Sequence, residues 1–410
     1  MTTLDSFLAA RRAIEALRSG VPSRDAVAAL GSGQTAIEDR FQAMCESVAG
    51  GGAGGLLLGG GFGAGKSHLL EHLARLALDA GWTVSRVVIS KETPLYDPAK
   101  VFRAAADSAL RAGQARPAVI EAAMALDLDG RGYAELLRWA TSSGSELNER
   151  FPATLALFAQ ARERDAAFVE AILQFWSGEP IAVAELRRRL KELGEQRPML
   201  PPVAAVELAR QRLRFASRLL AAAGSPGWLV FFDEVELIGR YSLLQRAKSY
   251  AELARWMRGE HGHGVPVASV FAMTDDFEAE VIRNRNDQEL LPAKVRAKDT
   301  PEASALATAA EVGMRIIDRE MHLLTPPDDV ELKQAYDRLR ELHGRAFRWR
   351  PPDVAGLERL GATRMRQYVR AWINEWDLVR LDPGFRPETE AVNVHSDYRE
   401  DPDLERSEPE

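Results

Sequence analysis

A glycine-rich octapeptide at residues 60–67 lies between an apolar run and a helical pattern. It reads G-G-F-G-A-G-K-S, follows Leu56, Leu57 and Leu58, and precedes a helical pattern over residues 68–80. This order of strand, loop and helix is the context that a G-x-x-x-x-G-K-[ST] phosphate-binding loop requires. It favours α/β architectures, in which a buried strand and a helix N-terminus hold such a loop.

The loop predicts a site for a nucleoside triphosphate. We expect Lys66 to contact the β- and γ-phosphates, Ser67 to ligate Mg²⁺, and backbone N–H groups to surround the phosphates. The alternative is a flexible connector, since residues 50–65 are rich in glycine. The predicted cofactors are ATP and Mg²⁺, and the predicted nucleotide-binding residues are Gly60, Gly61, Phe62, Gly63, Ala64, Gly65, Lys66, Ser67 and His68.

A second motif follows the apolar run G-W-L-V-F-F at residues 227–232. The run leads directly into Asp233 and Glu234, which is the Walker B pattern of a buried strand that ends in two carboxylates. We expect Asp233 to hold Mg²⁺ opposite Ser67, and Glu234 to orient and polarise an attacking water. An exposed acidic strand end is the alternative.

The composition is typical of a globular protein with a buried core. The chain has 410 residues, of which 46% are hydrophobic and 28% are charged. No apolar run approaches the roughly 20 residues that span a bilayer, and the N-terminus lacks a secretory pattern. The single cysteine, Cys45, excludes an internal disulfide and a thiolate metal cluster. We therefore expect a cytoplasmic protein without a membrane partner.

The formal net charge of −7 is located at the C-terminus. Residues 388–410 hold nine Asp and Glu residues against Arg399 and Arg406, so the rest of the chain is formally neutral. This composition predicts an acidic tail that is disordered, because it has few large apolar groups to bury. A docking segment or a mimic of nucleic-acid charge remains the alternative.

Between the expected strand at 83–90 and Gly227 lie about 130 residues of mostly helical periodicity, far more than a strand crossover needs. Helical patterns over residues 99–112, 133–140, 152–176, 181–193 and 203–223 predict an inserted module. Strands are expected at 83–90 and 265–273, and helices at 4–17, 304–323, 328–342 and 363–378. The expected domains are N-terminal helices (1–45), a nucleotide core (46–94 and 225–300), a helical insertion (95–224), a C-terminal helical lid (301–387) and the acidic tail (388–410).

Several classes of nucleotide-binding protein are disfavoured by missing or misplaced motifs. The chain has neither the guanine-reading N-K-x-D of a GTPase nor the R-x-G-R-x-G-R of a helicase. The sequence L-G-S-G-Q at residues 30–34 precedes the phosphate loop, whereas an ABC signature follows it, so we interpret it as a turn between helices. What remains resembles the AAA+ class of P-loop NTPases.

In that resemblance two further residues have implied roles. Thr274, after the strand 265–273, occupies the position of the first sensor of the γ-phosphate and the lytic water. Arg364 ends the sequence G-A-T-R and opens a helix, as the second-sensor arginine does in the origin-recognition branch. A solvated surface charge is the alternative for Arg364. The expected catalytic residues are Lys66, Glu234, Thr274 and Arg364.

Four longer stretches, at residues 88–103, 233–242, 249–256 and 363–378, resemble the ATP-binding BrxD proteins of bacterial BREX phage-exclusion systems. The similarity extends over nearly all of residues 11–387. It implies an AAA+ ATPase that works with other BREX-type defence proteins, among them a DNA methyltransferase, an alkaline-phosphatase-like protein and a larger ATPase. ATP binding and hydrolysis would drive assembly or remodelling of a protein/DNA complex, with a homo-oligomer and DNA contact through partners. A nucleotide-gated scaffold with little turnover, or a small-molecule kinase, is the alternative.

Other charged residues are weaker candidates. Residues 187–191 and 210–218 are basic and could contact DNA, although such helix faces are more often solvated. His261 and His263 lack nearby cysteines, so we expect no metal there. Lys91, Glu92, Tyr96 and Lys100 could couple the nucleotide to the insertion. An arginine finger for a neighbouring subunit could be Arg240, Arg246, Arg255, Arg283, Arg285 or Arg296.

Overall fold

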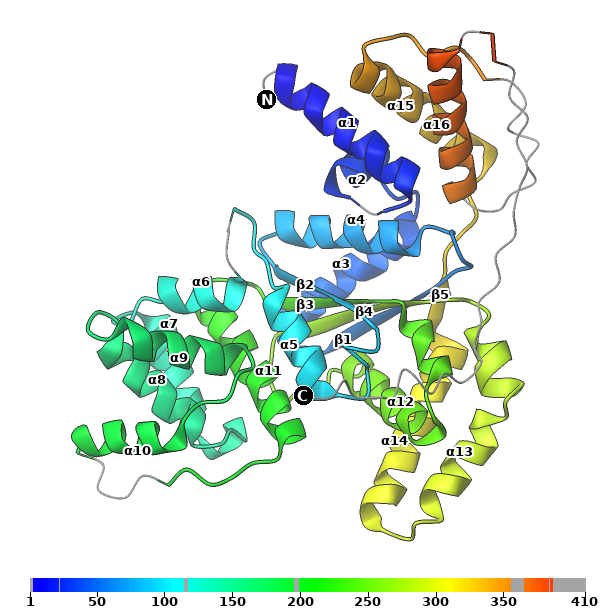
Figure 1. The fold of residues 1–410 in the computed structure, drawn as a ribbon. Coiled ribbons are helices and arrows are strands. Elements are labelled where there is room, and N and C mark those ends of the chain that lie inside the picture. Colours follow the sequence, from blue (N-terminus) through cyan, green and yellow to red (C-terminus); the bar gives the residue numbers. More distant parts are fainter. Residues whose placement is uncertain are drawn as a thin grey trace.

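Five parallel strands form one sheet in the order β2-β3-β4-β1-β5 (Figure 1). The computed structural model describes residues 3–21, 23–113, 117–194, 199–354, 365–382 and 384–385. The parallel pairing of all five strands confirms the predicted α/β class with a parallel sheet. The strands are β1 (Gly54–Gly59), β2 (Thr83–Val88), β3 (Trp228–Asp233), β4 (Val267–Met273) and β5 (Met321–Leu323).

The central strands β3 and β4 are mostly apolar because both faces of the sheet are covered. Every residue of β4 is buried, and only Asp233 of β3 is partly exposed. In the register of the sheet Phe232 lies opposite Phe271, and their rings stack with centroids 4.3 Å apart. This apolar centre ends at one edge of the sheet, where the carboxyl ends of the strands carry the polar residues.

Helices α3 (Thr35–Ala49) and α4 (Lys66–Asp79) cover one face of the sheet. Phe41 of α3 packs against Phe231 of β3, with ring centroids 6.1 Å apart. Leu69 and Leu73 of α4 are buried in the same cluster. The helix that follows the phosphate loop is thus anchored by its apolar side, so its N-terminus has a defined position over the sheet.

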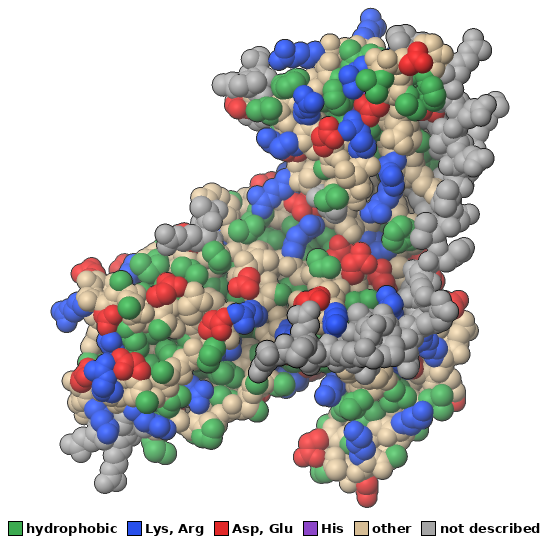
Figure 2. All heavy atoms as spheres, viewed as in Figure 1, with side chains coloured by type: hydrophobic (Ala, Val, Ile, Leu, Met, Phe, Trp, Pro, Cys, Tyr) green, Lys and Arg blue, Asp and Glu red, His purple; other side chains and the backbone are tan. Residues whose placement is uncertain are grey.

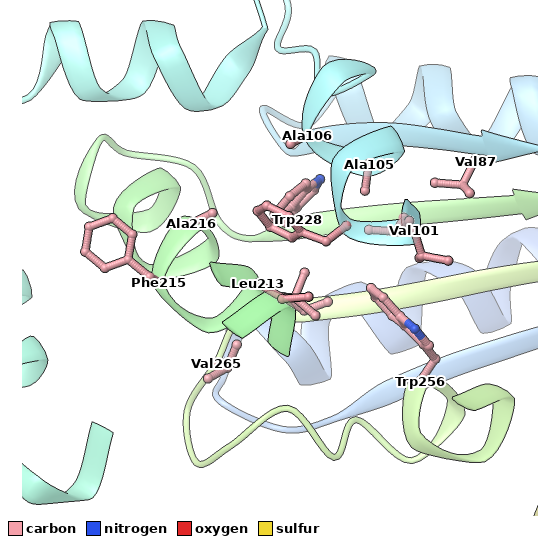
Figure 3. Close-up of a cluster of buried hydrophobic side chains, with 14 of the residues drawn as sticks. Val87, Val101, Ala105, Ala106, Leu213, Phe215, Ala216, Trp228, Trp256 and Val265 are labelled. Atoms are coloured by element: carbon pink, nitrogen blue, oxygen red, sulfur yellow. The ribbon is translucent and has the colours of Figure 1, made fainter. Parts of the chain in front are cut away.

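The opposite face is covered by α5 (Pro98–Asp107), α11 (Ala205–Ala222) and α12 (Leu243–Met257). Figure 3 shows the Trp228 indole between α5 and α11, beside Ala105 and Leu213. Its Nε1 donates to Ser85 Oγ at 2.8 Å, which satisfies the one polar atom of the buried ring. The large helical insertion is therefore attached to the sheet through an apolar contact.

The insertion forms a helical lobe beside the sheet (Figure 1). The prediction of one helix over residues 152–176 is wrong, because one helix ends at Ala161 and a second begins at Ala166. There the Asp165 side chain accepts from the Phe168 N–H and caps a new helix. The lobe consists of α6 (Ala118–Ala125), α7 (Arg131–Ala140), the 3₁₀ turn η1 (Ser143–Ser145), α8 (Arg150–Ala161), α9 (Ala166–Ser177) and α10 (Val183–Glu192).

A second projecting element follows β4. It begins with a π-helical turn, η3 (Glu278–Arg283), and continues as the helix pair α13 (Asp287–Arg296) and α14 (Pro301–Glu320). The prediction of a helix over 304–323 is partly wrong, because α14 ends at Glu320 and the next three residues are strand β5. Pairing with β1 explains the difference, since it is a contact that local helical spacing cannot reveal.

Gly313 allows α14 to approach α12 closely. A Cβ atom at this position would lie 2.1 Å from the backbone oxygen of Tyr250. We expect Gly313→Ala to lower the free energy of unfolding by about 1–3 kcal/mol, because the helix backbones must separate. Gly144→Ala is a matched control, since its Cβ would meet nothing within 4 Å. Chemical denaturation of both variants measures the difference, and equal stabilities would contradict the close packing.

Four helices from the two ends of the chain form a third lobe (Figure 1). Ile14, Leu339, Ile373 and Trp376 are fully buried in its core. The expected N-terminal block, residues 1–45, is thus divided, because its first two helices pack with the C-terminal lid and α3 packs on the sheet. This lobe, which we call the lid lobe, comprises α1 (Thr3–Ser19), α2 (Arg24–Leu30), α15 (Asp329–Phe347) and α16 (Met365–Leu381).

None of the helices that the structure describes combines the length and the apolar character that a membrane span requires. The predicted acidic tail, residues 388–410, lies outside the described residues.

Candidate functional site

The phosphate-loop sequence connects β1 to α4 in the arrangement that the motif predicts. Gly63 and Gly65 have φ values of 81° and 107°, which glycine adopts readily. Gly65 occupies the N-cap position of α4, and no side chain caps the helix there. The first N–H groups of α4 are therefore not taken by a capping side chain, and a helix N-terminus in this state suits an anion.

Lys66 lies inside the loop rather than in solvent. Its side chain is mostly buried, and its Nζ donates to Gly60 O at 2.7 Å and to Gly61 O at 3.3 Å. A buried ammonium needs compensating negative charge or dipoles. The loop carbonyls supply dipoles, and the phosphates of a nucleotide would supply charge in the same place. The residues present thus fit a polyphosphate ligand.

Arg86 of β2 adds a positive charge that sequence reasoning missed. Its guanidinium is paired with Glu71 of α4 at 2.8 Å and donates to the backbone oxygen of Ser67 at 3.4 Å. Arg24 of the lid lobe approaches the same Glu71 at 3.8 Å. The only sequence signal was an arginine within the apolar strand 83–90. Arg86 stabilises the first turn of α4, from which the Ser67 hydroxyl would reach a metal ion.

The carboxylates of the second motif lie at the carboxyl end of β3. Asp233 Oδ1 accepts from the Glu234 N–H at 3.0 Å, and Glu234 has the left-handed backbone conformation with φ of 58°. Burial and the neighbouring Asp233 raise the pKa of Glu234, while Lys66 and Arg366 act in the opposite direction. Glu234 and Lys66 of the phosphate loop therefore share one electrostatic environment.

Thr274 follows β4 directly and is almost completely buried. Because β4 lies between β3 and β1, Thr274 is at the same edge of the sheet as Asp233 and the phosphate loop. The structure thus brings together the predicted loop, Walker B and first-sensor residues. With Asp233 and Ser67 the edge offers one carboxylate and one hydroxyl, which fits a hydrated Mg²⁺ that also uses phosphate oxygens.

The lid lobe brings Arg366 of α16 close to the phosphate loop. Arg364 lies outside the described residues, so its role as second sensor remains a prediction. The Arg366 guanidinium lies over the Phe62 ring of the phosphate loop, 5.6 Å from its centroid, and donates to Gly20 O at 3.3 Å.

His68 contacts the lid side of the site. Its Nε2 is 2.7 Å from Gly31 O, and burial lowers the pKa of the imidazole. A neutral ring with Nε2–H as the donor explains this contact. Only the backbone N–H of His68 is then left for a phosphate. Two further bonds reach residues of the same turn. Arg338 of α15 donates to Leu30 O at 2.9 Å, and the Thr325 N–H donates to the Gln34 side-chain oxygen at 3.0 Å. The turn 30–34 thus joins the lid to the core, which agrees with its interpretation as a connection between helices.

The two basic runs that could contact DNA are engaged within the protein. Arg188 pairs with Glu185 at 2.6 Å, and Arg210 pairs with Glu252 at 2.5 Å. On the insertion lobe, at the left of Figure 2, acidic and basic side chains are interspersed. These two arginines thus have partners within the protein, and DNA contact through the runs stays a prediction. Three more of them, Arg212, Arg214 and Arg218, donate to backbone oxygens of Glu179, His261 and His263.

Arg246 cannot act as an arginine finger in this fold. Its guanidinium is buried and forms two bonds with Asp287, at 2.8 and 2.9 Å. Tyr250 donates to the same carboxylate at 3.1 Å. A buried pair of this kind is costly to break, so Arg246 holds α12 against α13. Other candidates also have partners: Arg285 donates to Gly239 O, Arg283 pairs with Asp318, and Arg296 pairs with Glu311.

The remaining candidates do not form a separate site. His261 is buried, and burial with three neighbouring arginines lowers its pKa to about 3. No group of three His, Cys, Asp or Glu residues suited to a metal occurs in the described part of the chain. Tyr96 packs edge-on against Tyr241, whose hydroxyl donates to Ser90 O at 3.3 Å. The segment with Lys91, Glu92 and Lys100 is thus attached to the loop after Walker B.

Comparison with known families agrees with the site. Residues 8–116 match the family model of the BREX system ATP-binding proteins BrxC/D. The resemblance to this family is confirmed. The BrxC/D match includes the phosphate loop and does not distinguish BrxC from BrxD. It supports ATP as the ligand of the loop. Neither a curated protein nor a solved structure matches the chain.

Proposed function

We propose that the chain is an AAA+ ATPase that binds and hydrolyses Mg-ATP in a BREX-type anti-phage defence system. The observation that carries the proposal is the shared environment of Lys66, Asp233 and Glu234 at the carboxyl edge of the sheet. In this proposal residues 46–94 and 225–300 are the nucleotide core, 95–224 the insertion, and 301–387 together with α1 and α2 the lid.

Each site residue has a distinct part in the proposed reaction. Lys66 and the N–H groups of residues 60–68 bind the phosphates, and Ser67 and Asp233 hold the metal ion. Bound Mg²⁺ supplies charge neutralisation at the phosphate oxygens. Glu234 orients the attacking water, and burial, which raises the pKa of its carboxyl, makes the carboxylate a stronger base. Thr274 and an arginine of the lid contact the γ-phosphate side.

Arg366 of the lid is expected to report on the γ-phosphate. Its position over Phe62 and its effect on Glu234 place its charge near the loop. We expect Arg366→Ala to weaken ATP binding by about tenfold and ADP binding by less, because a charge-assisted contact to one phosphate is lost.

Isothermal titration of both nucleotides measures this change. Arg370→Ala is the matched control, since Arg370 is exposed on the same helix. Arg364→Ala, measured in parallel, tests the original second-sensor assignment. Equal and small effects of Arg366→Ala and Arg370→Ala would contradict a sensing role for Arg366.

Hydrolysis would drive assembly or remodelling of a protein/DNA complex with other BREX-type proteins. The insertion lobe and the pair α13–α14 are the projecting elements available for such contacts (Figure 1). We propose that the chain forms a homo-oligomer and meets DNA through partners, because the arginines of the two basic runs are engaged internally.

The measured rate of ATP hydrolysis distinguishes the proposed ATPase from a scaffold that binds the nucleotide without hydrolysing it. Release of phosphate from ATP should require Mg²⁺, and particle mass should increase with ATP. Binding of ATP without phosphate release would favour the scaffold. Turnover that needs a small acceptor molecule, without any change in mass, would favour the kinase.

A further inference from the structure

A third carboxylate, Glu236, follows Asp233 and Glu234 in the short 3₁₀ helix η2 (Val235–Arg240). Its Oε2 atom is buried, and among the residues that the structure describes no hydrogen-bond donor reaches that atom. A buried carboxylate oxygen without a donor is unfavourable. It therefore needs a physical explanation, which neither of the sequence motifs supplies.

The groups that face Glu236 define its environment. Lys66 attracts its negative charge, whereas Glu234 and Asp233 repel it. The Lys66 ammonium itself bonds two loop carbonyls, the nearer being Gly60 O at 2.7 Å. Lys66 thus bonds the loop carbonyls and also acts electrostatically on the carboxylates of Glu234 and Glu236. A bound triphosphate would draw the same ammonium toward its β- and γ-phosphates.

We propose that Glu236 is a positioning residue for Lys66, whose carboxylate attracts the ammonium in the nucleotide-free site and competes for it with the γ-phosphate. This inference rests on the proposed function, since it assumes a triphosphate in the loop. The carboxylate also repels the phosphates directly. Removal of its charge then tightens ATP binding, and it affects ADP less because ADP has no γ-phosphate.

The competition depends on the ionisation of Glu236. Burial raises the pKa of Glu236 to about 7, and the attraction of Lys66 opposes this rise. The other charged groups that act on this cluster are Asp233, Glu234 and, on Glu234, Arg366. Glu236 is mostly ionised at pH 8 and mostly protonated at pH 6. The effect of the carboxylate is therefore present at pH 8 and largely absent at pH 6.

Isothermal titration with ADP and a non-hydrolysable ATP analogue at pH 6 and pH 8 tests the proposal. We expect Glu236→Gln to bind the ATP analogue about five- to tenfold more tightly than the wild type at pH 8, and about equally at pH 6. The effect on ADP at pH 8 is expected to be smaller. Glu163→Gln is the matched control, because Glu163 is exposed on the insertion lobe and carries the same charge.

Unchanged or weaker affinity of Glu236→Gln at pH 8 overturns the proposal. So does an equal increase at both pH values, since that is the result of a purely structural effect. Glu236→Met provides a second variant without the charge if thermal unfolding shows that Glu236→Gln is not folded. Absence of nucleotide binding by the wild type would contradict the proposed function itself, whereas wild-type binding with an unaltered Glu236→Gln contradicts only the role of Glu236.

Discussion

Lys66→Ala is expected to weaken ATP binding by at least about 100-fold. Lys66 is the ammonium inside the phosphate loop, and its two contacts at 2.7 and 3.3 Å are to loop carbonyls rather than to the core. Its loss removes charge-assisted contacts to two phosphates, each worth about 1.5–3 kcal/mol. Isothermal titration with ATP gives the affinity of both proteins.

The fold should persist in this variant. The hydrophobic cluster between α4 and the sheet is formed by other residues, such as Leu69 and Leu73. Circular dichroism and thermal unfolding are the corresponding controls. Arg75→Ala removes a charge from the exposed side of the same helix and should leave ATP affinity unchanged. A folded Lys66→Ala protein with wild-type affinity would rule out the phosphate-loop assignment.

Glu234→Gln is expected to bind ATP and to hydrolyse it about 10²–10⁴-fold more slowly. The amide keeps the shape of the side chain and removes the carboxylate that would polarise water. Asp233 remains available for the metal ion, so affinity should change little. Phosphate release under single-turnover conditions measures the step, and ATP-dependent oligomers should persist longer in this variant.

The neighbouring carboxylate provides the comparison. If the bond-breaking step depends on Glu234, Glu236→Gln retains turnover at pH 8 while Glu234→Gln loses it. Wild-type turnover in Glu234→Gln would show that another group activates the water. Because both variants remove one charge from the same short segment, a general electrostatic effect should change them alike.

The phosphate loop and the carboxylates could be predicted because their signals are local. A strand, a glycine-rich turn and a helix N-terminus are adjacent in sequence, and Asp233 is the last residue of the apolar strand β3. For Thr274 the local signal gives only its place directly after an apolar strand, and its role as a sensor is implied by the resemblance to the AAA+ class. That these segments meet at one edge follows from parallel strand pairing, whose carboxyl ends coincide.

The helices were predicted less completely. Regular apolar spacing indicates that one side of a helix is buried, but it does not say against which partner. The break between α8 and α9 depends on the Asp165 cap, and the end of α14 depends on pairing of β5 with β1. Both are decided by contacts that lie outside the helical period of the segment.

By itself, the sequence determined the α/β class of fold, the position of the phosphate-loop sequence between a strand and a helix, and the position of Asp233 and Glu234 at the end of an apolar strand. Each of these depends on residues that are neighbours along the chain. Only the tertiary structure decided that α1 and α2 join α15 and α16 in one lobe. It also brought Arg366 over Phe62 and buried Arg246 against Asp287. The physical reason is that burial and pairing of charges depend on which surfaces meet, and contacts between distant segments determine that.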